Sequence, residues 1–278
     1  MSAPLFGSDA FSPEEIAERV EKIGVAKARL PLHALLMLGM LAGAFIGLGS
    51  LYSVIVVSDP TLPLALQRVL AGIAFSLGLL LVVVAGAELF TGNNLIAMAW
   101  AEGKVTSGEL VFNWFVVCSA NFAGAVVLAS IVFLSGHADA YAATYVKIAT
   151  AKTSLPFVKA FFSGVMCNVL VCLAVWMTLA GRSVVDKAVA VVFPVSAFVA
   201  AGFEHSVANM YLIPLGTMLQ AAAGQPVQTF GLVRNLVPVI AGNLVGGSVL
   251  VALVYYVIYR WPLRAIAAAA SSRSGPKG

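Results

Sequence analysis

The sequence has 278 residues, of which 61% are hydrophobic and only 10% are charged, and its mean hydropathy is +0.99. Soluble domains carry about 25% charged residues, so this composition could not cover a water-exposed surface. It excludes an ordinary soluble protein and indicates an integral membrane protein. The net charge of +4 comes from basic residues in short flanks between apolar runs, so it predicts no nucleic-acid partner.

The polar N-terminal segment, residues 1–31, predicts a cytoplasmic amphipathic helix. Ser12 is a candidate helix cap, Pro13 fits the first turn, and Glu15 completes a capping pattern. Glutamates lie where a secretory signal peptide would need an apolar core, so we expect no such signal. We expect the helix to rest on the bilayer or on the helix bundle, and a gating role is an open alternative.

Long apolar stretches predict six membrane-spanning helices within a channel domain at residues 32–259, followed by a cytoplasmic tail at 260–278. The stretches are residues 32–57, 69–100, 110–134, 155–180, 188–223 and 233–259. The second and the fifth are too long for one simple crossing, and each contains a glutamate beside glycine. The predicted class is therefore an all-α membrane protein whose second and fifth spans are broken.

The distribution of lysine and arginine predicts the orientation in the membrane. Six spans leave both termini on one side, and that side collects eleven of the 16 basic residues. The other side has Arg68, Lys147, Lys152, Lys159 and Arg234. We therefore expect both termini in the cytoplasm and the protein in a bacterial inner membrane.

The chain contains an internal repeat. Residues 86–93 and 202–209 both read Gly-x-Glu, with an asparagine five residues after the glutamate. Downstream, two asparagines and a glycine recur at identical spacing, as Asn113, Asn121 and Gly124 and then as Asn235, Asn243 and Gly246. Because each copy holds three spans, the two copies must cross the membrane in opposite directions, a plan typical of transporters and channels.

Glu88 and Glu204 are the only acidic residues within the predicted spans. A charge at the centre of a bilayer costs about 2.5–3.5 kcal/mol, so each glutamate needs a special setting. A break in the helix would free backbone N–H groups, and a carboxylate can accept several of them. We therefore expect both glutamates to have a structural role in the loops, and direct proton transport by either is the alternative.

Function is expected where the two copies of the repeat differ. Leu89 in the first copy is replaced by His205 in the second. His205 then lies in an unwound segment beside an intramembrane carboxylate, which makes it the main candidate functional residue. His33 and His137 lie in flanking segments, where we expect them to be solvated.

Several segments carry a resemblance to a known family. They are residues 75–79, 87–91, 167–177, 181–187, 202–210, Pro238 and residues 242–247. On these segments the chain resembles the formate/nitrite transporter family, and the resemblance covers most of its length. It implies an aquaporin-like protomer of six helices, built from inverted repeats of three helices and assembled as a homopentamer with one pore per protomer.

The resemblance also implies roles for individual residues. Apolar constrictions would flank the central histidine, formed by Phe75, Leu79, Leu89, Val171 and Phe198. Hydrogen-bonding groups near His205 would be Thr91, Asn209 and Asn243, and Lys152 would stand at the outer vestibule. From the residues alone Lys152 could equally be a solvated loop lysine, Thr91 a helix cap, and Asn243 a contact between spans.

The resemblance predicts a channel or transporter for a small monovalent weak-acid anion, with formate first and nitrite or hydrosulfide as alternatives. Residues 181–187 look closer to the formate branch, whereas Thr91-Gly92 and residues 151–153 look more like the nitrite branch. A bare anion in an apolar constriction is unfavourable, so we expect it to cross neutralised by a proton from His205 or from water.

Three other functional classes share features with this sequence. An aquaporin-type pore for neutral solutes would share the repeat, but neither loop contains an Asn-Pro-Ala motif. A proton-coupled secondary transporter cannot be separated from a passive pore by sequence. A membrane enzyme is disfavoured because the sequence shows no metal-ligand cluster, no nucleophile with a base, and no cofactor motif. The expected partners are further copies of the chain, the anion, protons and lipid, without a cofactor.

Overall fold

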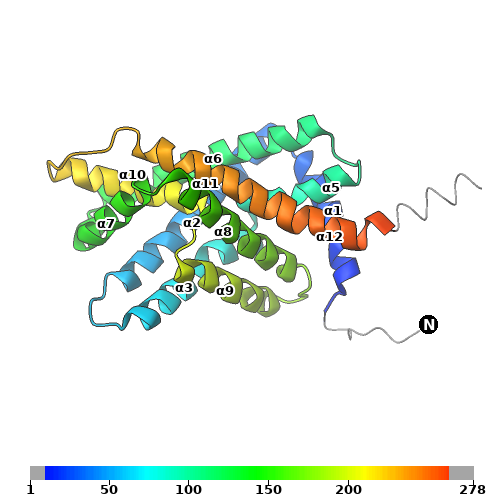
Figure 1. Ribbon diagram of the computed structural model, residues 1–278, viewed down its shortest axis with the longest axis horizontal. Helices are drawn as coiled ribbons and strands as arrows, with labels where there is room; N and C mark the ends of the chain where they lie inside the picture. Colours follow the sequence, from blue (N-terminus) through cyan, green and yellow to red (C-terminus); the bar gives the residue numbers. More distant parts are fainter. Residues whose placement is uncertain (1–9, 263–278) are drawn as a thin grey trace, which may run out of the picture.

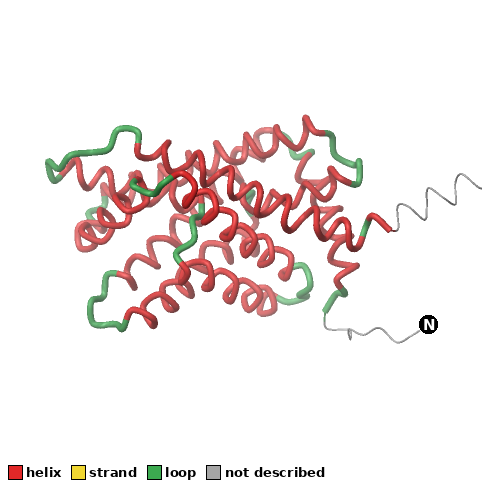
Figure 2. Tube along the Cα trace, in the orientation of Figure 1, coloured by secondary structure: helices red, strands yellow, loops and turns green. Residues whose placement is uncertain are grey.

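The computed structural model describes residues 10–262, and this part of the chain consists of helices and connecting loops without strands (Figures 1 and 2). Six helical segments are long and apolar enough to cross a membrane: Leu32–Val57, Leu64–Gly86, Ser107–Leu134, Phe157–Thr178, Val184–Ala201 and Gly231–Tyr259. The predicted all-α class with six spans is confirmed. Parts of the predicted N-terminal segment and tail, residues 1–9 and 263–278, lie outside the described residues.

The two repeats follow each other along the chain. The first contains α1 (Pro13–Ala28), α2 (Leu32–Val57), α3 (Leu64–Leu81), the π-helical turn η1 (Val82–Gly86), α4 (Phe90–Asn93), η2 (Asn94–Ile96), α5 (Ala97–Ala101) and α6 (Ser107–Leu134). The second contains η3 (His137–Tyr141), α7 (Ala142–Thr153), α8 (Phe157–Thr178), α9 (Val184–Ala201), α10 (Ser206–Ala222), α11 (Gly231–Leu244), the π-helical segment η4 (Val245–Leu253) and α12 (Val254–Tyr259).

The same packing recurs in both repeats. Helix α2 packs between α3 and α6, and α8 packs between α9 and α11. The repeats are joined where α3 packs against α9 and where α10 packs against α6. Both ends of the described chain lie at one end of the bundle, on the right in Figure 1, as an even number of crossings requires. Helices α1 and α7 are equivalent elements that precede the first span of each repeat.

Glycines bring the helices of each repeat into very close contact. A Cβ atom on Gly124 of α6 would overlap the backbone oxygen of Met40 on α2. In the second repeat, a Cβ atom on Gly242 of α11 would overlap the backbone oxygen of Phe161 on α8. Small residues at such positions are typical of membrane helices, because they let backbones approach. The close approach places the asparagines of α6 and α11 against the two breaks.

The N-terminal helix α1 rests on the bundle rather than only on the bilayer. Its predicted cap is confirmed: Ser12 and Glu15 form a reciprocal capping box, and Pro13 occupies the first turn. Its buried apolar side chains join a cluster with residues of α5, α8 and η4. The buried Glu21 pairs with Lys104 and with Arg260, whose Nη2 lies 2.7 Å away. These contacts hold α1 against the bundle.

Candidate functional site

The second and fifth spans are broken at equivalent places. The first break follows Gly86 (φ 86°) and contains Ala87 and Leu89 in extended conformation. The second follows Gly202 (φ 75°) and ends with His205, which is also extended (φ −103°, ψ 114°). Glycine adopts such positive φ values without steric cost, which is why each helix can end there.

The carboxylate of the second break belongs to a buried polar cluster. Lys152 Nζ lies 2.8 Å from Glu204 Oε1, and Asn209 Nδ2 donates to Glu204 Oε2 at 2.6 Å. Asn235 Nδ2 reaches the same oxygen at 3.2 Å and also donates to the backbone oxygen of Lys152. Lys152 lies in the last turn of α7, a helix that the sequence analysis read as a loop. Its ammonium group is thus paired rather than freely solvated.

An equivalent cluster surrounds the carboxylate of the first break. Lys27 Nζ lies 2.6 Å from Glu88 Oε1, and Asn93 Nδ2 donates to Glu88 Oε2 at 2.7 Å. Asn113 Nδ2 donates to the backbone oxygen of Lys27, as Asn235 does to that of Lys152. The role of Lys27 was not predicted from the sequence, in which this lysine is one of the eleven basic residues on the side of the termini.

A sequence signal for Lys27 was available. Lys27 precedes Gly39 by the same number of residues as Lys152 precedes Gly164. These glycines are equivalent, because their backbone oxygens accept hydrogen bonds from the equivalent asparagines of the two repeats. The internal repeat therefore begins before the first span.

Within the described residues, the backbone N–H groups freed at the breaks do not donate to the carboxylates of Glu88 and Glu204. The expectation that these carboxylates would accept them is therefore wrong. Phe90 N donates to Asn121 Oδ1 at 2.8 Å, and Ser206 N donates to Asn243 Oδ1 at 3.0 Å. The physical reason is that a neutral amide oxygen satisfies a backbone N–H without burying a charge. The carboxylates remain available for the two ammonium groups, which need a negative partner more.

The two breaks meet at His205. Its Nε2 lies 3.1 Å from Thr91 Oγ1, and its Nδ1 accepts the backbone N–H of Ala208, also at 3.1 Å. An acceptor at Nδ1 assigns the ring proton of a neutral imidazole to Nε2, which therefore donates to Thr91. The hydroxyl hydrogen of Thr91 then points away from Nε2 of His205. The imidazole also acts as the N-cap of α10, a role the sequence analysis did not assign.

The predicted constriction residues surround His205. Its ring stacks on Phe198 with centroids 5.9 Å apart and meets Phe75 at 6.3 Å. A buried gap beside the ring is too small for a water molecule, and it is lined among others by Phe75, Leu79, Leu89, Val171, Phe198 and His205. The structure thus brings together all five apolar residues that the resemblance implied.

A wider vestibule of about 480 Å³ lies at the α1 end of the bundle. Lys27 and Glu88 line it, and Leu79 and Leu89 line both this vestibule and the narrow gap. The two leucines therefore close the vestibule, whereas Phe75 and Phe198 contact the imidazole. The family resemblance implied these apolar residues as one set, without this division.

The two remaining candidates, Asn209 and Asn243, differ in the hydrogen-bond partners of their side-chain amides. The amide group of Asn243 is bonded entirely to backbone, because Nδ2 donates to the oxygens of Gly164 and Glu204 and Oδ1 accepts from Ser206. Asn209 belongs to the Lys152 cluster, and its buried Oδ1 has no hydrogen-bond partner within residues 10–262. Of the predicted hydrogen-bonding residues, Thr91 is the one whose side chain contacts the imidazole of His205.

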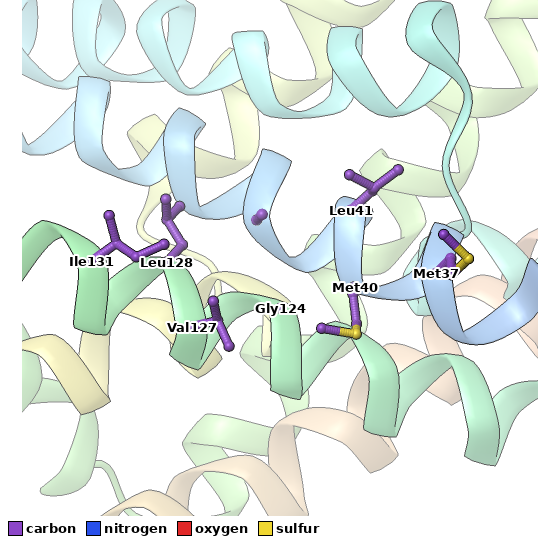
Figure 3. Close-up of a pocket in the computed structure, with 8 residues that line it drawn as sticks. Met37, Met40, Leu41, Gly124, Val127, Leu128 and Ile131 are labelled. Atoms are coloured by element: carbon purple, nitrogen blue, oxygen red, sulfur yellow. The ribbon is translucent and has the colours of Figure 1, made fainter. Parts of the chain in front are cut away.

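Another hollow on the bundle does not suit an anion. A groove of about 370 Å³ runs between α2 and α6, with Met37, Met40 and Leu41 on one side and Val127, Leu128 and Ile131 on the other (Figure 3). These side chains offer no hydrogen-bond donor. His33 and His137 are exposed, and the part of the chain that the structure describes has no group of three potential metal ligands.

Comparison with known proteins supports one family. The profile of the family described as "Formate/nitrite transporter" matches residues 14–257 of the chain. The chain belongs to the formate/nitrite transporter family. Its relatives in this family include formate channel FocA of Escherichia coli strain K12, with 37% identity over 90% of this chain and 95% of the relative. Formate channel BtFdhC of Bacillus thuringiensis is 38% identical over 89% of this chain and 95% of its own.

Solved structures of the same family agree with the fold. A structure described as "Pentameric formate channel with formate bound" has a TM-score of 0.75 and 36% identity, and covers 82% of this chain and 97% of its own. A structure described as "FNT family ion channel" has a TM-score of 0.79 and 29% identity, over 88% and 98% of the two chains. The relatives are channels and transporters, so the chain is a transport protein of this family rather than an enzyme.

Proposed function

We propose that the chain is a pH-dependent formate channel that assembles as a homopentamer, with one pathway in each protomer. Its similarity to formate channels of two bacterial genera and to a pentameric formate channel supports the substrate and the assembly. We further propose that it lies in a bacterial inner membrane with both termini in the cytoplasm, on the basis of the asymmetric distribution of lysine and arginine.

One observation carries the proposal: an apolar gap too narrow for water lies beside His205, next to a vestibule lined by Lys27 and Glu88. We take this vestibule as one mouth of the pathway, and from the inverted repeat we expect the other mouth at the equivalent Lys152–Glu204 pair. A water-filled pore for ions does not need a dry apolar gap. A bare anion inside this gap would lose its hydration without compensation. A weak acid can avoid this cost, because its protonated form is neutral. The geometry therefore favours a permeant such as formate over a permanent anion such as chloride.

In this proposal, formate enters a mouth as the anion and leaves it for the gap as formic acid. The proton comes from a hydronium ion, so that formate and hydronium give formic acid and water. The neutral tautomer of His205, with its proton on Nε2, could give up that proton only by becoming an anion. We therefore assign the transferred proton to water, which was one of the two sources that the sequence analysis left open.

His205 and Thr91 then orient the permeant. The Nε2 proton of His205 occupies Thr91 Oγ1 as an acceptor, which leaves the hydroxyl hydrogen of Thr91 free to donate. A carbonyl oxygen of formic acid is a suitable acceptor for this hydroxyl. Within the otherwise apolar gap, such a contact replaces one hydrogen bond lost on leaving water. Lys152 and Lys27 attract the anion to the two mouths.

Uptake into proteoliposomes tests the proposal. Formate, nitrite, hydrosulfide, chloride and glycerol are compared across an external pH series, with wild-type protein and with His205→Asn and His205→Phe. Asparagine is a good N-cap and keeps the start of α10, whereas phenylalanine removes both the cap and the donor. We expect formate uptake to rise as external pH falls, because more formate is then protonated. We expect both substitutions to lower uptake at each pH, because they remove the imidazole that fixes Thr91 Oγ1.

Several outcomes would contradict the proposal. Faster uptake of nitrite or hydrosulfide than of formate would assign another weak-acid substrate to the same pathway. Equal passage of chloride or glycerol would remove the argument from the apolar gap. Accumulation of formate above equilibrium, driven by a pH gradient and saturating at low concentration, would indicate a proton-coupled transporter instead of a channel.

A further inference from the structure

Three polar side chains near the first break have no polar equivalent in the other repeat. The spacing from the shared glutamates, asparagines and glycines defines the equivalent positions. Thr91 corresponds to Val207, Asn94 corresponds to Met210, and Asn168 corresponds to Gly43. Structural polar groups recur in both repeats, as the two lysine–glutamate clusters do. Polar groups present in one copy alone therefore call for another explanation.

These three residues form one hydrogen-bonded cluster centred on Asn168 of α8. Asn168 is fully buried, and its Nδ2 lies 2.7 Å from Asn94 Oδ1 and 3.3 Å from the backbone oxygen of Thr91. Asn94 Nδ2 in turn donates to the backbone oxygen of Phe90 at 3.1 Å. The cluster thus holds the first turn after the first break through two consecutive backbone carbonyl groups.

The cluster also reaches the second break. Asn168 Nδ2 lies 2.6 Å from the backbone oxygen of Asn243, and the side chain of Asn243 caps Ser206, the residue that follows His205. Because Nδ2 carries two hydrogens for its three acceptors, one hydrogen is shared between two of them. Asn168 thereby links the backbone that carries Thr91 to the residue that fixes the backbone next to His205. These two side chains meet at 3.1 Å, a distance that a small shift of either break would lengthen.

The neighbouring helix leaves room for this arrangement. A Cβ atom on Gly247 of η4 would overlap Asn168 Nδ2 and would lie 2.8 Å from both Asn94 Cβ and Cys172 Sγ. The segment around Gly247 is π-helical, and such irregular turns are frequent at functional sites. Only a glycine at this position allows the amide of Asn168 to lie between both breaks.

We propose that Asn168, supported by Asn94, is a positioning residue that holds Thr91 Oγ1 within hydrogen-bonding distance of His205 Nε2. The inference rests on the proposed function for its effect on transport, but its structural content is independent of the substrate. Asn168 acts through the backbone of Thr91 and does not need to contact the permeant. Its loss should therefore weaken the Thr91–His205 contact and lower the passage of formic acid through the gap.

The first test measures formate uptake by reconstituted Asn168→Leu and Asn94→Met proteins. Leucine resembles asparagine in size without its hydrogen bonds, and methionine is the residue at the equivalent position of the second repeat. We expect uptake by Asn168→Leu to fall about tenfold, because Asn94 Oδ1 and the backbone oxygen of Asn243 lose their Asn168 donor and the backbone oxygen of Thr91 keeps only Cys172 Sγ as a side-chain donor. The control is Ser50→Ala, which removes a buried hydroxyl bonded only within its own helix, to Ile46, and should leave uptake unchanged.

A double substitution separates positioning from a general loss of structure. If Asn168 acts through Thr91, Asn168→Leu combined with Thr91→Val should transport no worse than Thr91→Val alone. If the losses of uptake caused by the two single substitutions multiply in the double variant, the inference is overturned. Should Asn168→Leu fail to assemble, the milder Asn94→Met, which leaves two acceptors of Asn168 in place, combined with Thr91→Val gives the same comparison.

Nitrogen-15 NMR of histidine-labelled protein in liposomes gives a readout without any permeant. The chain has 3 histidines, so the signal of His205 can be assigned by its loss in His205→Asn. We expect Asn168→Leu to shift the Nε2 resonance and Ser50→Ala to leave it in place. An unchanged resonance in Asn168→Leu would overturn the inference. A wild-type protein that carries no formate would instead contradict the proposed function alone.

Discussion

Removal of the ammonium group of Lys152 tests whether the buried ion pair supports the second break. In Lys152→Met, Glu204 keeps its asparagine donors but loses its only cationic partner within residues 10–262, in a site where its side chain is 5% exposed. Loss of one partner of a buried pair costs about 3–5 kcal/mol. At roughly 2–4 °C per kcal/mol for a chain of this size, the melting temperature should fall by roughly 6–20 °C. Scanning fluorimetry of the detergent-solubilised protein measures this shift.

The equivalent pair of the first repeat provides a matched control. The side chain of Lys27 is 28% exposed, against 16% for Lys152, so water can compensate more of the loss. We expect Lys27→Met to lower the melting temperature by less than Lys152→Met. The reasoning would be refuted by an unchanged melting temperature in Lys152→Met or by the reverse order of the two variants.

A compensating substitution separates stability from transport. The double variant Lys152→Met/Glu204→Gln buries no unpaired charge, and glutamine can still accept from Asn209. We expect it to recover most of the lost melting temperature. Formate uptake should nevertheless stay below the wild-type rate, because the cation at that mouth is absent. Full recovery of both quantities would contradict a role for Lys152 in attracting the anion.

Two further predictions concern packing. Gly124→Ala should prevent stable assembly, since the added methyl group overlaps the Met40 carbonyl. In Gly108→Ala of the same helix the methyl group meets only Thr106 Oγ1, at 3.9 Å, so the melting temperature should stay the same or rise. Size-exclusion chromatography and scanning fluorimetry compare the two variants. Leu79→Ala should widen the narrow gap and admit chloride, whose passage is measured with an anion-selective electrode. If the variant still excludes chloride, the assignment of Leu79 to that gap is contradicted.

The sequence predicted the architecture well because membrane insertion leaves strong signals. Long apolar runs defined six spans, and two glutamates within over-long runs located both breaks. Helix α7 was missed because it is short and of mixed polarity, so neither a hydropathy window nor a strong helical stripe marks it. Lys152 was consequently read as a loop residue, although it occupies the last turn of that helix.

The polar core was harder to predict than the fold. The carboxylates were expected to accept backbone N–H groups, but whether an amide or a carboxylate approaches a given N–H depends on how closely α6 packs on α2. Nor could the pattern of apolar residues identify the walls of the gap: in a chain where most residues are hydrophobic, Leu79 does not stand out from Leu80 or Leu81. The family resemblance selected those walls, and the structure then brought them together around His205.

The matched lysine–glutamate pairs have a consequence for the response to voltage. Lys27 with Glu88, and Lys152 with Glu204, each sum to zero charge, with one pair at each broken span. A membrane potential of 100 mV does about 2.3 kcal/mol of work on each elementary charge moved across the bilayer. If each pair moves as a unit, the potential does no net work on the protein itself. A neutral acid in the gap is equally insensitive to the potential, so the crossing of the gap should be electrically silent, and only the pH and concentration gradients would determine its direction.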